Sequence, residues 1–145
     1  MQSYTQIAFN GAMALLMGLL IGVEREHAHK DLPWFAGIRT FPLITLFGFL
    51  CGLASQAGEK WMLPVGLTGV SAVAVVAYLV RSQGPNKGAT TEFMALLAYV
   101  FGALSALGYV IPAAIFAVVA TLLLSIKLPC TIWRKPSRKT RFTPS

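Results

Sequence analysis

Residues 93–126 read FMALLAYVFGALSALGYVIPAAIFAVVATLLLSI and contain no charged side chain. A helix that crosses a bilayer needs about 20 predominantly apolar residues, so this run is too long for one span. A single helix over 91–126 would extend about 54 Å, against a hydrocarbon core of about 30 Å. Gly108, Tyr109 and Pro112 lie near the middle of the run. They predict a hairpin between two helices, Thr91–Leu107 and Ile111–Ile126.

Three further runs lack charge, at residues 1–23, 40–58 and 61–80, and each is about one span long. They predict helices over about 6–23, 40–57 and 62–80, with residues 24–33 as a charged loop. Only 12% of the residues are charged, whereas soluble domains carry about 25%. We therefore expect an all-α, polytopic integral membrane helix bundle with five transmembrane helices. Residues 1–127 form the transmembrane domain, and 128–145 form a basic tail that we expect to be disordered.

The distribution of Lys and Arg predicts the orientation of the chain. In the four gaps between the predicted helices and then in the tail, these residues number 3, 1, 2, 0 and 6. Successive segments lie on opposite faces of the membrane, so the counts sum to 3 + 2 + 6 = 11 on one face and 1 + 0 = 1 on the other. Basic residues concentrate in cytoplasmic loops, which places the N-terminus outside and the tail in the cytoplasm. A four-helix count would put the tail outside and weaken this asymmetry. No Lys or Arg precedes the first apolar run, so we expect that run to stay as a membrane helix instead of a cleaved signal peptide.

Several function classes are disfavoured. The net charge is +7, but half of the basic residues lie in 127–141, where they suit anionic lipid headgroups. No nucleic-acid motif accompanies them, and no catalytic motif or phosphate-binding loop is present, so we expect neither nucleic-acid binding nor enzyme activity. Cys51 and Cys130 lack metal-type spacing, and His27 with His29 is too weak a pattern to predict a metal site. We expect no metal and no cofactor.

Charged and polar residues meet at the predicted cytoplasmic face. Glu24, Arg25 and Glu26 end the first predicted helix, and Arg39 directly precedes the second. Arg39 or Arg25 can pair with Glu24 or Glu26, which would lower the cost of placing charge near lipid. The candidate functional polar cluster comprises Glu24, Arg25, Glu26, Arg39, Thr91 and Glu92. Two alternatives remain open: interfacial charges that anchor helix ends, and capping of a helix start by Thr91 and Glu92.

Small residues recur at a spacing of four and predict close helix packing, because such residues let helix backbones approach in lipid. An internal seam and a homo-oligomer seam both fit this pattern. The residues are Ala14, Gly18, Gly22, Gly48, Gly52, Ala98, Gly102 and Ala106. Asn10 is an amide well inside the first predicted helix, and it either bonds to a neighbouring helix or lines a path.

Two segments, GLLIGVERE at 18–26 and AGIRTFPL at 36–43, resemble the N-terminal membrane domain of the MgtC/SapB family. The segment TTEF at 90–93 is similar to a longer branch, in which a second hydrophobic domain of unknown function follows. The resemblance covers about 7–126 and implies a bacterial inner-membrane protein. Members of the family are associated with growth in low magnesium and with virulence, and some are thought to restrain the membrane ATP synthase. The same six residues of the polar cluster are the positions that this resemblance marks.

The expected function is regulatory or transport-associated, in magnesium or ion homeostasis, with the Glu/Arg cluster binding an ion or a membrane partner. A proton- or cation-coupled transporter is one alternative. A structural helix-packing module, or half of a larger membrane protein that has been truncated, is another, because 128–145 does not resemble the family's continuation. The expected partners are the lipid bilayer and either a second copy of the chain or another membrane protein.

Overall fold

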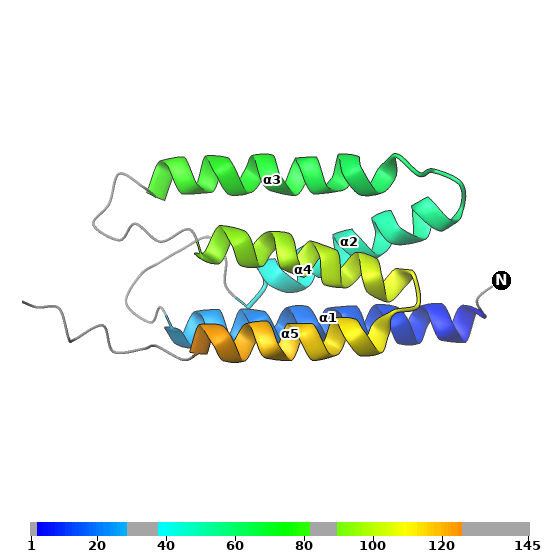
Figure 1. Ribbon diagram of the computed structural model, residues 1–145, viewed down its shortest axis with the longest axis horizontal. Coiled ribbons are helices and arrows are strands. Elements are labelled where there is room, and N and C mark those ends of the chain that lie inside the picture. Colours follow the sequence, from blue (N-terminus) through cyan, green and yellow to red (C-terminus); the bar gives the residue numbers. More distant parts are fainter. Residues whose placement is uncertain (1–2, 29–37, 82–89, 126–145) are drawn as a thin grey trace, which may run out of the picture.

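The computed structural model describes residues 3–28, 38–81 and 90–125, and within these ranges the chain forms five α-helices and no strand. The helices are α1 (Tyr4–Ala28), α2 (Thr40–Gln56), α3 (Met62–Arg81), α4 (Thr90–Ala106) and α5 (Val110–Ser125), shown in Figure 1. The all-helical class and the five helices are as predicted. The expected tail at 128–145, with Cys130, lies outside the described residues, as do His29 and most of both predicted cytoplasmic loops.

Two glycines end α2 and α4 in the same way. Gly58 and Gly108 have φ values of +116° and +92°, in the left-handed region where a side chain would be strained. After α4, the Gly108 amide donates to Ser105 O at 3.2 Å and the Tyr109 amide donates to Leu104 O at 2.9 Å. The turn after α2 repeats this pattern, so both helices end in a Schellman motif. The predicted hairpin near Gly108 is therefore confirmed.

The first helix is longer than the apolar run. The predicted boundary at residue 23 is wrong, because α1 continues to Ala28 through part of the segment assigned to a charged loop. Glu, Arg and Ala are good helix formers, and a change from apolar to charged residues need not end a helix. Arg25 and His27 lie in the last turn, where positive charge suits the helix dipole.

The helices alternate in direction and lie in three layers, with α3 on one side, α2 and α4 in the middle, and α1 and α5 on the other (Figure 1). Among the described residues, α4 contacts all four other helices, whereas α3 contacts only α2 and α4. We call the end of the bundle where α1 and α5 finish and α2 and α4 start the charged end. The opposite end, with the turns around Gly58 and Gly108, is the turn end.

The most extensive contact is between α2 and α4. A Cβ atom on Gly48 would lie 2.9 Å from the Tyr99 carbonyl carbon, and one on Gly102 would lie 2.8 Å from the Thr45 carbonyl carbon. These neighbours are backbone atoms, so no rotamer change could make room. On the other side of α2, a Cβ on Gly18 of α1 would lie 2.6 Å from the Pro42 Cα. The two glycine contacts let α2 pack directly against both α4 and α1.

The eight small residues predicted to mediate packing are all buried, and two further glycines join them. Gly11 lies against Phe49, and Gly66 of α3 lies against Tyr99 and Cys51. The Tyr99 hydroxyl donates to Leu63 O at 2.8 Å and so connects α4 to α3. The predicted residues occupy three helices: Ala14, Gly18, Gly22, Gly48, Gly52, Ala98, Gly102 and Ala106.

Large apolar side chains cover the outer surface. They include Leu16 on α1, Leu50 on α2, Val76 on α3 and Leu123 on α5, each more than half exposed. Only 6% of the apolar segment of α3 is buried. By length and composition, Tyr4–His27 and Met62–Val80 qualify as membrane spans, while α2, α4 and α5 are apolar but shorter. So many exposed large apolar side chains are unusual for a soluble monomer.

We predict that Gly102→Ala destabilises the protein by about 1–3 kcal/mol, because the new methyl group would overlap the backbone of α2. Gly69→Ala is the matched control: Gly69 lies on α3 with nothing within 4 Å of an added Cβ, so the change should be neutral or slightly stabilising. Thermal unfolding followed by circular dichroism in a mild detergent measures both. Equal unfolding temperatures for the two variants would contradict the close approach of α2 and α4.

Candidate functional site

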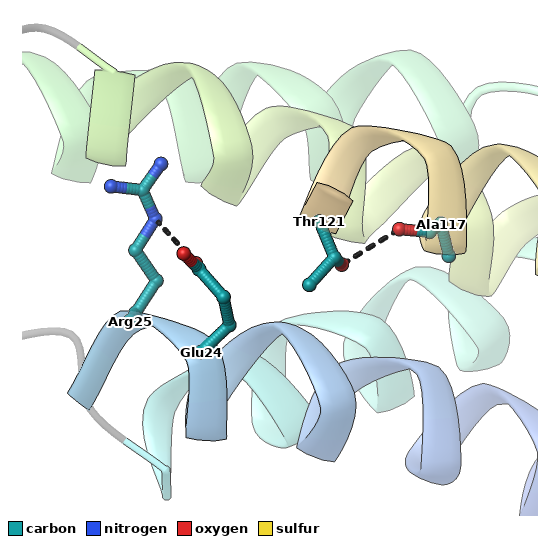
Figure 2. A network of polar contacts seen from close by, with 4 residues as sticks. All are labelled: Glu24, Arg25, Ala117 and Thr121. Atoms are coloured by element: carbon teal, nitrogen blue, oxygen red, sulfur yellow. Dashed lines mark hydrogen bonds and ion pairs between the residues drawn. The ribbon is translucent and has the colours of Figure 1, made fainter. Parts of the chain in front are cut away.

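An arginine is buried at the charged end of the bundle. The Arg25 side chain is 6% exposed and that of Glu24 is 15% exposed, and Arg25 Nε lies 3.9 Å from Glu24 Oε2. This separation is that of an ion pair and is too long for a hydrogen bond. Figure 2 shows the two side chains rising together from the last turns of α1. Burial of an ion pair among apolar helices is costly, so this pair requires an explanation beyond packing.

The helical repeat explains why Arg25 points inward. Ala14, Gly18, Ile21 and Arg25 follow one another at intervals of three or four residues, and all are buried. They form the face of α1 that contacts α2, α4 and α5. Because α1 continues to Ala28 without a break, the same face carries Arg25 into the bundle. If Arg25 lay in a loop, the helical repeat would not determine which way its side chain points.

The structure divides the predicted cluster into an inner and an outer part. Glu26 is exposed, and its Oε2 accepts a hydrogen bond from the Ile38 amide at 3.4 Å. Arg39 is also exposed and stands at the N-cap of α2, where its side chain makes no capping hydrogen bond. No ion pair joins Arg39 to another residue in the described ranges. Of the pairings left open by the sequence, the structure shows the one between Arg25 and Glu24.

Thr91 and Glu92 lie in the first turn of α4, at the same end of the bundle as Arg25. Thr91 is buried, and Glu92 is half-buried with its Oε2 atom shielded from solvent. An acidic residue at this position suits the positive end of the helix dipole. Thr91 and Glu92 can therefore stabilise the start of α4, contribute to the polar cluster, or do both.

One polar residue at this end was not among the sequence candidates. Thr121 of α5 is 8% exposed, and its hydroxyl donates to Ala117 O at 2.7 Å. Figure 2 shows Thr121 on α5 across from the Glu24–Arg25 pair, and α5 contacts α1. The sequence signal that could have identified Thr121 is its spacing. Ala113, Ala117 and Thr121 are four residues apart and form the buried stripe of α5.

Asn10 behaves differently from the expectation that it bonds to a neighbouring helix. It is fully buried on α1, and its Oδ1 accepts a hydrogen bond at 3.0 Å from Gln6 Nε2 of the same helix. It lies towards the turn end, far along α1 from Arg25. Among the residues that the structure describes, no three His, Cys, Asp or Glu side chains come together in a way that could hold a metal ion.

The inner part of the site can therefore offer three kinds of group. Glu24 and Glu92 supply carboxylates, Arg25 supplies a guanidinium, and Thr91 and Thr121 supply hydroxyls, from α1, α4 and α5. Carboxylates suit cations, and a guanidinium suits an anionic group. Glu26 and Arg39 add one charge of each sign at the exposed rim.

Exposed apolar side chains on every helix, five packed helices and a buried ion pair near one end are typical of a helical membrane protein. The sequence model of the MgtC family matches residues 12–132, which is most of the chain. The protein belongs to the MgtC family, as the segments at 18–26 and 36–43 predicted. No curated protein and no solved structure matches it.

We predict that Arg25→Ala lowers the free energy of unfolding by about 3 kcal/mol, because it leaves the Glu24 carboxylate without its cation in a poorly solvated position. Arg39→Ala removes the same charge from an exposed position and should change stability by less than about 0.5 kcal/mol. Denaturant or thermal unfolding of both variants in one detergent gives the comparison. If Arg39→Ala proves as damaging as Arg25→Ala, the division into inner and outer parts is wrong.

Proposed function

We propose that this protein crosses the bacterial inner membrane five times and acts in magnesium or ion homeostasis, as a regulatory or transport-associated protein. Its charged end binds an ion or a membrane partner from the cytoplasm. The observation that carries the proposal is the burial of Arg25 beside Glu24 within an apolar bundle. Ionisable groups in such surroundings are costly, and in membrane proteins they are retained mainly where they function.

Three observations support five spans. The helices alternate in direction, so both turns with Gly58 and Gly108 lie at one end (Figure 1). Every helix presents exposed apolar side chains, as expected for lipid contact. Lys and Arg divide 11 to 1 between the two faces under this threading, which favours a cytoplasmic charged end and an N-terminus outside.

The two parts of the site suggest two roles. Glu26 and Arg39 are exposed at the rim, where a ligand or partner in the cytoplasm meets them first. Arg25 and Glu24 lie deeper, where low polarity strengthens any electrostatic interaction. Binding at the rim can therefore be coupled to the buried pair through the last two turns of α1, which carry all of these residues except Arg39.

A growth assay tests the proposed function separately from folding. In a strain that lacks its own copy, Glu24→Gln and Arg25→Gln should reduce growth in low magnesium about tenfold or more at matched membrane abundance. The reason is that each change removes one charge of the Arg25–Glu24 pair and leaves a neutral polar side chain in its place. His27→Gln, at an exposed position on the same turn, serves as the control and should grow normally. Full growth of both charge variants at normal abundance would refute a functional role, and losses explained by abundance alone would indicate a structural module.

A second candidate function is a proton- or cation-coupled transporter, favoured by the second shielded carboxylate at Glu92. In this case purified protein in proteoliposomes would move a proton, Mg²⁺ or K⁺ down an imposed gradient. Glu24→Gln or Glu92→Gln would abolish that flux. Absence of any flux with the wild-type protein would leave the regulatory function.

The threading itself can be tested with single cysteines in a Cys51→Ala, Cys130→Ser background. His27→Cys at the charged end and Tyr109→Cys at the turn end both replace exposed residues. A membrane-impermeant maleimide should label Tyr109→Cys in intact cells, and His27→Cys only after permeabilisation. Labelling of both from the same side would overturn the five-span arrangement.

A further inference from the structure

Three of the five helices are short for a membrane span. Helix α2 contains 17 residues, and the residues on both sides of it are described. The end of α5 adjoins residues that the structure does not describe, but the charge-free sequence from Val110 stops before Lys127 and so covers 17 residues. At 1.5 Å per residue each of these segments extends about 26 Å, whereas an average hydrocarbon core is about 30 Å thick. The two longer helices, α1 and α3, have 25 and 20 residues. Thus α2 and α4 in the middle of the bundle, as well as α5 at its side, are shorter than the hydrocarbon core of a typical bilayer.

Polar residues at the helix ends shorten the apolar length further. In α4 the third residue is Glu92, so the uncharged part from Phe93 to Ala106 extends only about 21 Å. The charge-free part of α1 ends at Glu24, although the helix itself continues to Ala28. At its other end α1 opens with Tyr4, Thr5 and Gln6, so its apolar part from Ile7 to Val23 extends about 26 Å.

Exposed aromatic side chains mark the same thickness. At the turn end, Tyr4, Trp61 and Tyr109 are 93%, 79% and 60% exposed. At the other end, Tyr78 on α3 and Phe93 on α4 are 38% and 67% exposed. Tyr and Trp concentrate at the two membrane–water interfaces. From Trp61, directly before α3, to Tyr78 on α3, the interval corresponds to about 26 Å at the helical rise, in agreement with the lengths of the short helices.

A short helix cannot correct this mismatch by tilting, because tilt reduces the thickness that a helix spans still further. Nor can α4 shift along the membrane normal by itself. It contacts all four other helices, and its backbone is fixed against α2 at Gly102. The lipid is the component that adapts, by thinning around the protein.

We propose that the exterior of the bundle fits a hydrocarbon layer about 25 Å thick, so that the protein selects lipids with short acyl chains and thins an ordinary bilayer around it. The partner of this surface is the acyl region of a thin bilayer. The proposal rests on the five-span arrangement proposed above. Cysteine labelling tests that arrangement independently, so the failure of one is distinguishable from the failure of the other.

The test is a series of phosphatidylcholine vesicles with monounsaturated chains of about 14 to about 22 carbons. Wild-type protein is reconstituted in each, and its thermal unfolding is followed by circular dichroism. We expect the highest unfolding temperature at the short end of the series and a fall of about 5 °C or more at the longest chains. A maximum at the long end, or no dependence on chain length, would overturn the proposal.

A second measurement locates the interface directly. With Trp34 and Trp133 changed to Phe, the remaining Trp61 fluorescence can be quenched by lipids that carry a nitroxide at the headgroup or at the chain terminus. Trp61 should be quenched best by the headgroup label throughout the series, because the bilayer adapts to the protein. Stronger quenching by the chain-terminus label in long-chain lipids would mean that Trp61 sinks into an unthinned bilayer, which contradicts the proposal.

Discussion

Direct backbone contact between α2 and α4 is the constraint on which the rest of the bundle depends. Gly48 and Gly102 leave no room for a Cβ, because the partner helix presents backbone atoms at each position. Between helices surrounded by lipid there is little hydrophobic driving force, so close packing of small residues has to hold them together. Since α4 also contacts α1, α3 and α5, the position of α4 against α2 determines where every other helix can lie.

The same constraint determines the character of the charged end. Gly18 brings α1 against the Pro42 backbone of α2, which fixes the rotation of α1 about its axis. With that rotation set, the buried face of α1 ends in Arg25, and the guanidinium lies within the bundle beside Glu24. Glu26 and Arg39 remain at the exposed rim. The glycine contacts that pack α1 against α2 thus also decide which charges lie inside the bundle and which lie at its rim.

The sequence predicted the number and order of the helices well, because the runs between charged residues match spans and because Gly108, Tyr109 and Pro112 mark the break in the last run. It could not predict that α1 continues to Ala28, since charge does not by itself stop a helix. For the same reason it could not separate Arg25 from Arg39: only the rotation of a continuous α1 decides which charge enters the bundle. Thr121 and the hydrogen bond from Tyr99 to Leu63 O depend on which helices become neighbours, and that is a property of the tertiary arrangement.

The most direct test of the account is a cysteine crosslink between α2 and α4. A Cβ on Gly52 would lie 2.6 Å from the Ala106 Cβ, about 1 Å closer than the two Cβ atoms of a disulfide, so the bond can form once the two helices separate slightly. In a background without Cys51 and Cys130, the pair Gly52→Cys/Ala106→Cys should oxidise within one chain, while Gly69→Cys/Ala106→Cys, with Gly69 facing open space, should not. A Gly52–Ala106 pair that stays reduced, or that crosslinks only between chains, would contradict the packing from which the buried charge follows.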